Sequence, residues 1–85
     1  MPEVSRFYGI VITFYYDDHL PPHFHARYGN DRATVTLDGI VLGGALPARA
    51  LALVRAWAQL HRVELEADWD LARRGQPLLR IAPLD

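Results

Sequence analysis

The stretch that decides the fold spans residues 23–37 and reads HFHARYGNDRATVTL. Apolar and polar side chains alternate on both sides of its centre, which is typical of strands buried on one face. A two-residue loop in the Gly-Asn-Asp segment pairs the halves so that Phe24 and Ala26 share a face with Val35. The pattern therefore predicts a β-hairpin with one apolar and one polar face.

Two further strands flank this hairpin. The run before it is β-branched or aromatic almost throughout, and Pro21-Pro22 ends it because proline cannot continue a hydrogen-bonded ladder. After the hairpin, Asp38-Gly39 is a strong turn signal, and a short strand returns before Gly43-Gly44 ends the sheet. The four expected strands are about 7–16, 23–29, 32–37 and 40–42.

The second half of the chain has helical periodicity. Pro47 suits a first helical position, and an apolar stripe follows that changes phase before Leu65. One helix through residue 74 would be about 42 Å long, whereas a domain of this size is about 30 Å across. We therefore expect a break near 61–64, with Trp57 and Trp69 both in the core. The expected elements are helices at about 47–60 and 63–74 and an extended tail at 76–85.

These elements predict a single α+β domain over 1–85, a four-stranded antiparallel meander followed by two helices packed on one face. The length of 85 residues leaves no room for a second domain of typical size. So short a chain buries a modest share of its surface, which favours a homodimer or another protein partner.

Composition excludes several functional classes. The chain has no cysteine, so disulfides, thiol catalysis and cysteine-ligated metals are ruled out. The net charge of −1 argues against a strongly basic nucleic-acid arm and a polybasic membrane anchor. No apolar run approaches the roughly 18 residues of a membrane span, and no signal peptide is evident, so we expect a cytoplasmic protein with no membrane partner.

The block DHLPPHFH at residues 18–25 is the most distinctive motif. Together with RFYGI at 6–10, Leu46-Pro47 and WDLAR at 69–73, it resembles a small prokaryotic family, the domain of unknown function DUF4160. Members of that family usually carry a polar residue at the position of Leu20. The resemblance implies a component of a two-gene, toxin–antitoxin-like pair whose other product is a short protein encoded by the adjacent gene. It implies no catalytic residue.

The histidines of this block are candidate metal ligands or catalytic groups. His23 and His25 lie two apart on a predicted strand and so point the same way, and His19 is close enough in the loop to be a third zinc ligand. Asp17 and Asp18 are the nearest acceptors for the other ring nitrogens. The ordinary alternative is that each imidazole bonds a backbone carbonyl or a carboxylate, and on balance we expect no metal or other cofactor.

The polar face of the hairpin is a second candidate site. Arg27, Arg32 and Thr34 share this face with His23 and His25, and such a set suits phosphate groups of RNA or DNA. The same set, with a histidine as base and the arginines as phosphate ligands, suits metal-independent RNA cleavage. The ordinary alternative is the solvated face of a half-buried sheet.

We therefore expect a small interaction module rather than an enzyme, acting through a protein partner and nucleic acid. The alternatives are a ribonuclease-type toxin that uses His23 or His25 with Arg27 and Arg32, and a metal-binding domain. Ser5 is the only serine, and phosphate-loop and dinucleotide motifs are absent from the sequence, which disfavours conventional hydrolase and nucleotide-dependent chemistry.

Overall fold

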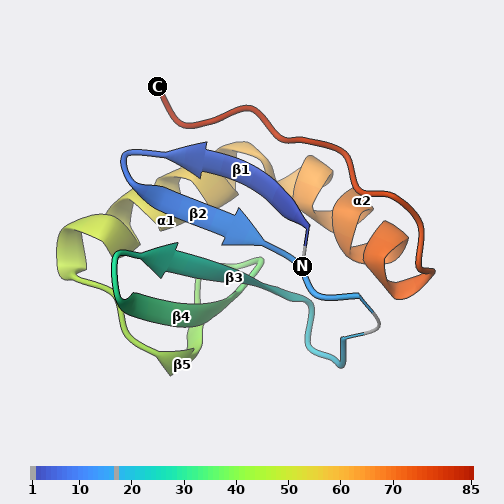
Figure 1. Ribbon diagram of the computed structural model, residues 1–85, viewed down its shortest axis with the longest axis horizontal. Helices are drawn as coiled ribbons and strands as arrows, with labels where there is room; N and C mark the ends of the chain where they lie inside the picture. The colour runs from blue at the N-terminus through green and yellow to red at the C-terminus, as the bar shows by residue number, and fades with distance from the viewer. Residues whose placement is uncertain (1, 17) are drawn as a thin grey trace.

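The computed structural model describes residues 2–16 and 18–85 and shows an α+β fold with one antiparallel sheet and two helices. The strands follow one another in the sheet in chain order, and both helices lie on one face of it (Figure 1). The elements are β1 (Glu3–Phe7), β2 (Ile10–Thr13), β3 (His23–Tyr28), β4 (Asp31–Thr36), β5 (Val41–Gly44), α1 (Ala48–Leu60) and α2 (Arg62–Arg73).

The sheet has five strands, so the expected four-stranded meander was wrong in one respect. In place of the single strand expected at 7–16, β1 and β2 form a hairpin in which Phe7 pairs with Ile10 across a turn at Tyr8 and Gly9. Both turn residues have positive φ, 50° and 79°, as in the tight turns that match the twist of a hairpin. Tyrosine is common in strands, so the residue type at position 8 predicted a continuous strand and not a turn.

The other end of the sheet also extends further than expected. Gly43 and Gly44 belong to β5 and pair with Thr34 and Ala33, although the pair of glycines was expected to end the sheet. Gly44 has a φ of 73°, and a Cβ there would lie 2.1 Å from the carbonyl oxygen of Arg32. Glycine is therefore required at this position because β4 passes so close.

The central hairpin has the expected register. Tyr28 pairs with Asp31 across a two-residue loop, and Phe24, Ala26 and Val35 are buried against the helices. Alternation then places the side chains of His25 and Arg27 on the sheet face that points away from the helices. We call this surface the open face.

The helices and the tail close the other face. α1 ends and α2 begins around His61, and Trp57 and Trp69 are both buried in the core. The tail runs beside β1 (Figure 1). The Ile81 N–H bonds the Val4 carbonyl at 2.8 Å, and Trp57 Nε1–H bonds the Ala82 carbonyl. The longest dimension is 33 Å, which a single helix of 42 Å would exceed. Neither helix in the described part of the chain has the length and hydropathy to cross a membrane.

Candidate functional site

Strand register gathers polar side chains into two rows across the open face. In one row Val11 pairs with Arg27, which pairs with Arg32 on β4. In the next row His25 lies between Thr13 and Thr34. Three of the residues expected to bind phosphate, Arg27, Arg32 and Thr34, are therefore neighbours of His25 on adjacent strands.

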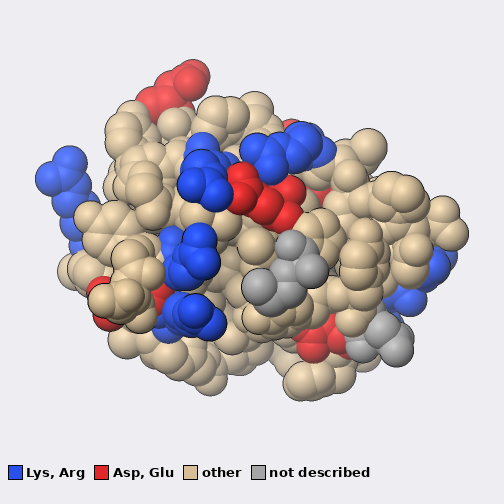
Figure 2. Space-filling model, viewed as in Figure 1, with Lys and Arg blue, Asp and Glu red and all other residues tan. Residues whose placement is uncertain are grey.

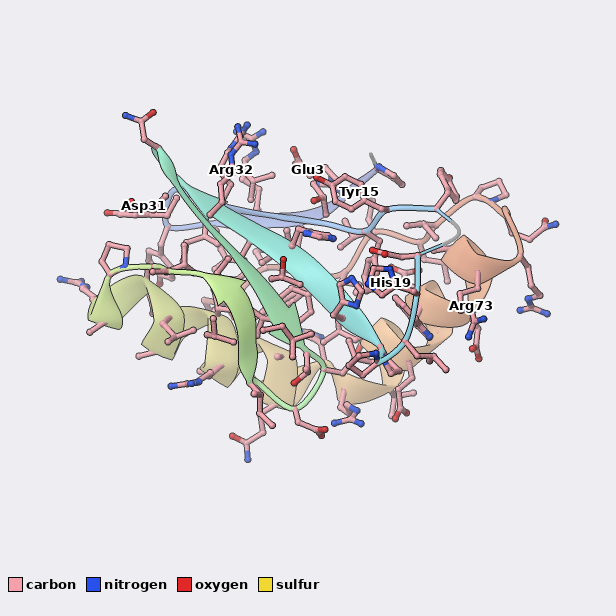
Figure 3. The ribbon with its side chains drawn as sticks, turned by 90° about the horizontal axis from the view of Figure 1, so that it is seen from below. Glu3, Tyr15, His19, Asp31, Arg32 and Arg73 are labelled. Atoms are coloured by element: carbon pink, nitrogen blue, oxygen red, sulfur yellow. The ribbon has the colours of Figure 1, made fainter. Side chains whose placement is uncertain are left out.

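These rows line a cleft of about 430 Å³ on the open face. Figure 3 shows Glu3, Tyr15 and Arg32 on the side of the sheet away from the helices. The cleft is lined by Glu3, Val11, Thr13, Tyr15, His25, Ala26, Arg27, Arg32, Ala33, Thr34, Gly43 and Gly44. A sheet surface with converging guanidinium, imidazole and hydroxyl groups has the chemistry to hold an anion.

The open face is basic even though the whole chain is not. Arg6 pairs with Val11 and so extends the arginine row onto β1, and both Arg6 and Arg80 bond Glu3. The Arg6 guanidinium, followed by Arg80, lowers the pKa of Glu3 to about 2. Figure 2 shows basic side chains gathered on this face with acidic side chains among them.

Arg27 and Arg32 differ from Arg6 in having no acidic partner within the described ranges 2–16 and 18–85. Both are exposed, and they stand directly opposite each other in the β3–β4 register. Opposed side chains on neighbouring strands have Cβ atoms about 5 Å apart, where like charges destabilise the pair. An anion between the two guanidiniums would remove this repulsion.

A cluster of one carboxylate and two imidazoles lies at one end of the cleft. Asp18 Oδ2 is 2.8 Å from His23 Nε2 and 3.4 Å from His25 Nε2. We call Asp18, His23 and His25 the histidine corner. One ligand atom from each of the three lies within 4.8 Å of the other two.

The surroundings of the corner fix both rings. His23 is buried, its Nδ1 lies 2.7 Å from the Pro21 carbonyl, and its ring packs on Trp69 of α2 at 5.3 Å between centroids. His25 is half-buried, with its Nδ1 3.4 Å from Thr34 Oγ1 and its ring against Tyr15. The Pro21 carbonyl and Trp69 of α2 thus hold His23 in place, and Thr34 and Tyr15 hold His25.

The electrostatics of the corner favour an ionised carboxylate beside neutral His25. Burial by itself would raise the pKa of Asp18, but hydrogen bonds from the His19 backbone N–H and from His25 and His23 outweigh it, so the pKa is lowered. Burial lowers the pKa of His25, and Asp18 only partly opposes this effect. At neutral pH the Asp18 carboxylate therefore faces an uncharged His25 ring.

Comparison with known proteins places the chain in a family. A family model described as a domain of unknown function, DUF4160, matches residues 9–70, which is most of the chain. The chain belongs to the DUF4160 family. The curated proteins and the solved structures gave no match. The matched segment of this DUF4160 protein contains the histidine corner, Arg27, Arg32 and Thr34.

The DUF4160 structure brings together some of the predicted site residues and separates one. Of the three histidines named as candidate ligands for a metal site, His23 and His25 lie together beside Asp18, and His19 does not join them. The His19 side chain is 90% exposed and lies beside the other oxygen of Asp18, at 3.2 Å. A backbone N–H bond from His19 to Asp18 turns the carboxylate toward the corner. Asp17, expected as an acceptor, lies outside the described residues.

Sequence reasoning missed Glu3, Arg6 and Tyr15. The first two lie on β1, before residue 7, where the first expected strand began. Recognition of Gly9 as a turn residue would have folded 3–7 back onto 10–13 and placed Arg6 beside Val11. Tyr15 follows β2, and its contact with the His25 ring carries no signal in the sequence.

Proposed function

We propose that this DUF4160 protein is a small binding module whose open face holds a phosphate-bearing strand of nucleic acid. The observation that supports the proposal most is the opposed pair of Arg27 and Arg32 beside His25 and Thr34 in one cleft. Guanidinium groups bind phosphate oxygens in a fork, and hydroxyl and imidazole groups add further hydrogen bonds. Tyr15 at the cleft offers a ring on which a base can stack.

A single strand fits this surface better than a duplex does. The cleft lies on a sheet face, and single strands are bound by sheets that combine basic grooves with aromatic rings. The charge is local, since Glu3 offsets part of Arg6 and Arg80 but leaves Arg27 and Arg32 uncompensated within the described residues. Binding that rests on so few phosphate contacts should be weak and strongly dependent on salt.

The test is fluorescence anisotropy with labelled single-stranded RNA and DNA of about ten nucleotides, at about 50 and 200 mM salt. We expect Arg27→Ala/Arg32→Ala to weaken binding at least tenfold at low salt and to reduce the salt slope by about 1.4. The matched control is Arg49→Ala/Arg74→Ala, which removes the same charge from exposed positions on α1 and just after α2. Equal losses in both variants, or no binding by the wild type, would contradict the proposal.

Cleavage is the second candidate function, because His25 lines the same cleft as the two arginines. Burial lowers the pKa of His25, which keeps the ring neutral and able to accept a proton at neutral pH. The integrity of the RNA after the binding assay separates the two functions. Intact RNA supports the binding module, and cleavage that is lost in His25→Ala supports a ribonuclease.

We also propose a protein partner from a toxin–antitoxin-like gene pair. The family resemblance supplies the gene pair, and the sheet supports it by offering an edge for strand addition. The tail lies along β1, whereas β5 pairs only with β4 among the described residues. Co-expression with the product of the adjacent gene tests this proposal, and we expect co-purification of the two chains. Separate elution of the two chains would count against it.

A further inference from the structure

We propose that Asp18, His23 and His25 form a binding site for one divalent transition-metal ion, with Zn²⁺ as the ion that fits best. The proposal is independent of nucleic-acid binding, because it rests on the histidine corner and not on the arginine row. The contacts with Asp18 point to Asp18 Oδ2, His23 Nε2 and His25 Nε2 as the ligand atoms.

Hydrogen bonding at His23 directs its second ring nitrogen toward a carboxylate. Its Nδ1 lies 2.7 Å from the Pro21 carbonyl, and a carbonyl oxygen only accepts, so Nδ1 carries a proton. Nε2 lies 2.8 Å from Asp18 Oδ2, which is an acceptor when ionised, so this contact holds either a second ring proton or a metal ion in its place. A metal ion that replaces the proton would bond both atoms.

His25 adds a third donor atom to the same point. Thr34 Oγ1 lies 3.4 Å from His25 Nδ1 and can accept its proton, which leaves Nε2 free at 3.4 Å from Asp18 Oδ2. Ring protons on both histidines are needed to bond this carboxylate oxygen to the two nitrogens. A metal ion bonds all three at once.

The spacing is close to that of a tetrahedral zinc site. Bonds of 2.0–2.1 Å at tetrahedral angles hold neighbouring ligand atoms about 3.3 Å apart. The distance from Asp18 Oδ2 to His25 Nε2 is 3.4 Å, and the distance to His23 Nε2 would have to open from 2.8 Å by about 0.5 Å. Asp18 lies on a loop, where such a shift strains no strand or helix.

The groups around the corner are those that orient metal ligands. A histidine that binds a metal usually gives its other N–H to a carbonyl, carboxylate or hydroxyl, as Pro21 and Thr34 allow here. The nitrogen and oxygen donors, with no cysteine in the chain, favour zinc over softer ions. Three protein ligands leave a fourth position for water or for a molecule in the adjoining cleft.

Calorimetric titration of Zn²⁺ into untagged, metal-free protein tests the site. We expect one ion per chain for the wild type and at least a tenfold weaker affinity for Asp18→Asn and for His25→Ala, since each loses one ligand. These two variants avoid the buried His23, and circular dichroism checks that each is folded. Co²⁺ in place of Zn²⁺ should give the strong visible absorption of a tetrahedral ion in the wild type only.

His19→Ala is the matched control, because His19 is a neighbouring but exposed histidine outside the ligand set. It should bind zinc as the wild type does, and so should Arg27→Ala/Arg32→Ala, which keeps this test separate from that of nucleic-acid binding. The proposal is overturned if the wild type binds no stoichiometric zinc. Unchanged affinity in the folded Asp18→Asn and His25→Ala variants, or an equal loss in His19→Ala, would overturn the ligand set.

Discussion

His25 belongs to both parts of the site. Its Nε2 faces Asp18 in the histidine corner, and its side chain lines the cleft beside the arginine row. The parity of β3 creates this double role, because His23, His25 and Arg27 project from the same side of one strand. A substitution at His25 therefore affects metal binding and cleft chemistry together, whereas Asp18→Asn and Arg27→Ala separate them.

Asp68 allows a pH prediction away from the site. Its side chain is fully buried on α2, accepts the Leu79 N–H through Oδ1, and has no partner for Oδ2 among the described residues. Burial raises the pKa of Asp68 above its ordinary value of 3.8. The contribution of Asp68 to the unfolding free energy is thus fully present below pH 3.8. It is lost as the pH rises through the raised pKa of Asp68 in the folded protein.

Asp68→Asn keeps an oxygen acceptor for Leu79 but cannot ionise. We therefore expect the difference in unfolding free energy, variant minus wild type, to increase between about pH 4 and pH 7. Urea unfolding at several pH values measures this difference. Asp70→Asn on the exposed side of the same helix is the matched control for the loss of one carboxylate. A flat difference for Asp68→Asn would show that burial does not perturb the carboxyl.

At the scale of elements, β5 is held close to β4 at Gly44. A Cβ at Gly44 would collide with the Arg32 carbonyl, and the positive φ of 73° disfavours any side chain. We expect Gly44→Ala to lower the unfolding free energy by at least about 1 kcal/mol. Gly43→Ala is the control, because a Cβ there meets nothing within 4 Å. Equal urea midpoints for the two variants would contradict the close approach.

The elements also show what the sequence could predict. The central hairpin follows from alternation and turn residues, which are local signals that the tertiary structure did not override. The helix break near His61 follows from the length of one continuous helix compared with the size of the domain. The Tyr8–Gly9 turn was missed because strand-forming residues surround a single glycine. Asp18 was named from the sequence as an acceptor for the histidine ring nitrogens, and it contacts both rings, but its place beside His23 and His25 as a third candidate ligand depends on how the loop folds over β3.

At the scale of the molecule, the two faces of the sheet differ in what covers them. One face carries the apolar core beneath α1, α2 and the tail, and the other is left open with its arginines and the histidine corner. The acidic residues of α2 cancel the positive charge of these arginines in the net charge of the chain. A net charge of −1 is therefore compatible with a basic open face. The net charge of the whole chain therefore does not describe the charge of the open face.

The most direct test of the open-face account is a titration followed through backbone amide NMR signals. A single-stranded RNA of about eight nucleotides is added to labelled protein at low salt. We predict that the shifted signals cluster on β2, β3 and β4, around Thr13, Arg27 and Thr34, and that signals of the exposed side of α1 stay in place. Shifts centred on α1 and α2, or no shifts at all, would contradict the claim that the open face is the binding surface.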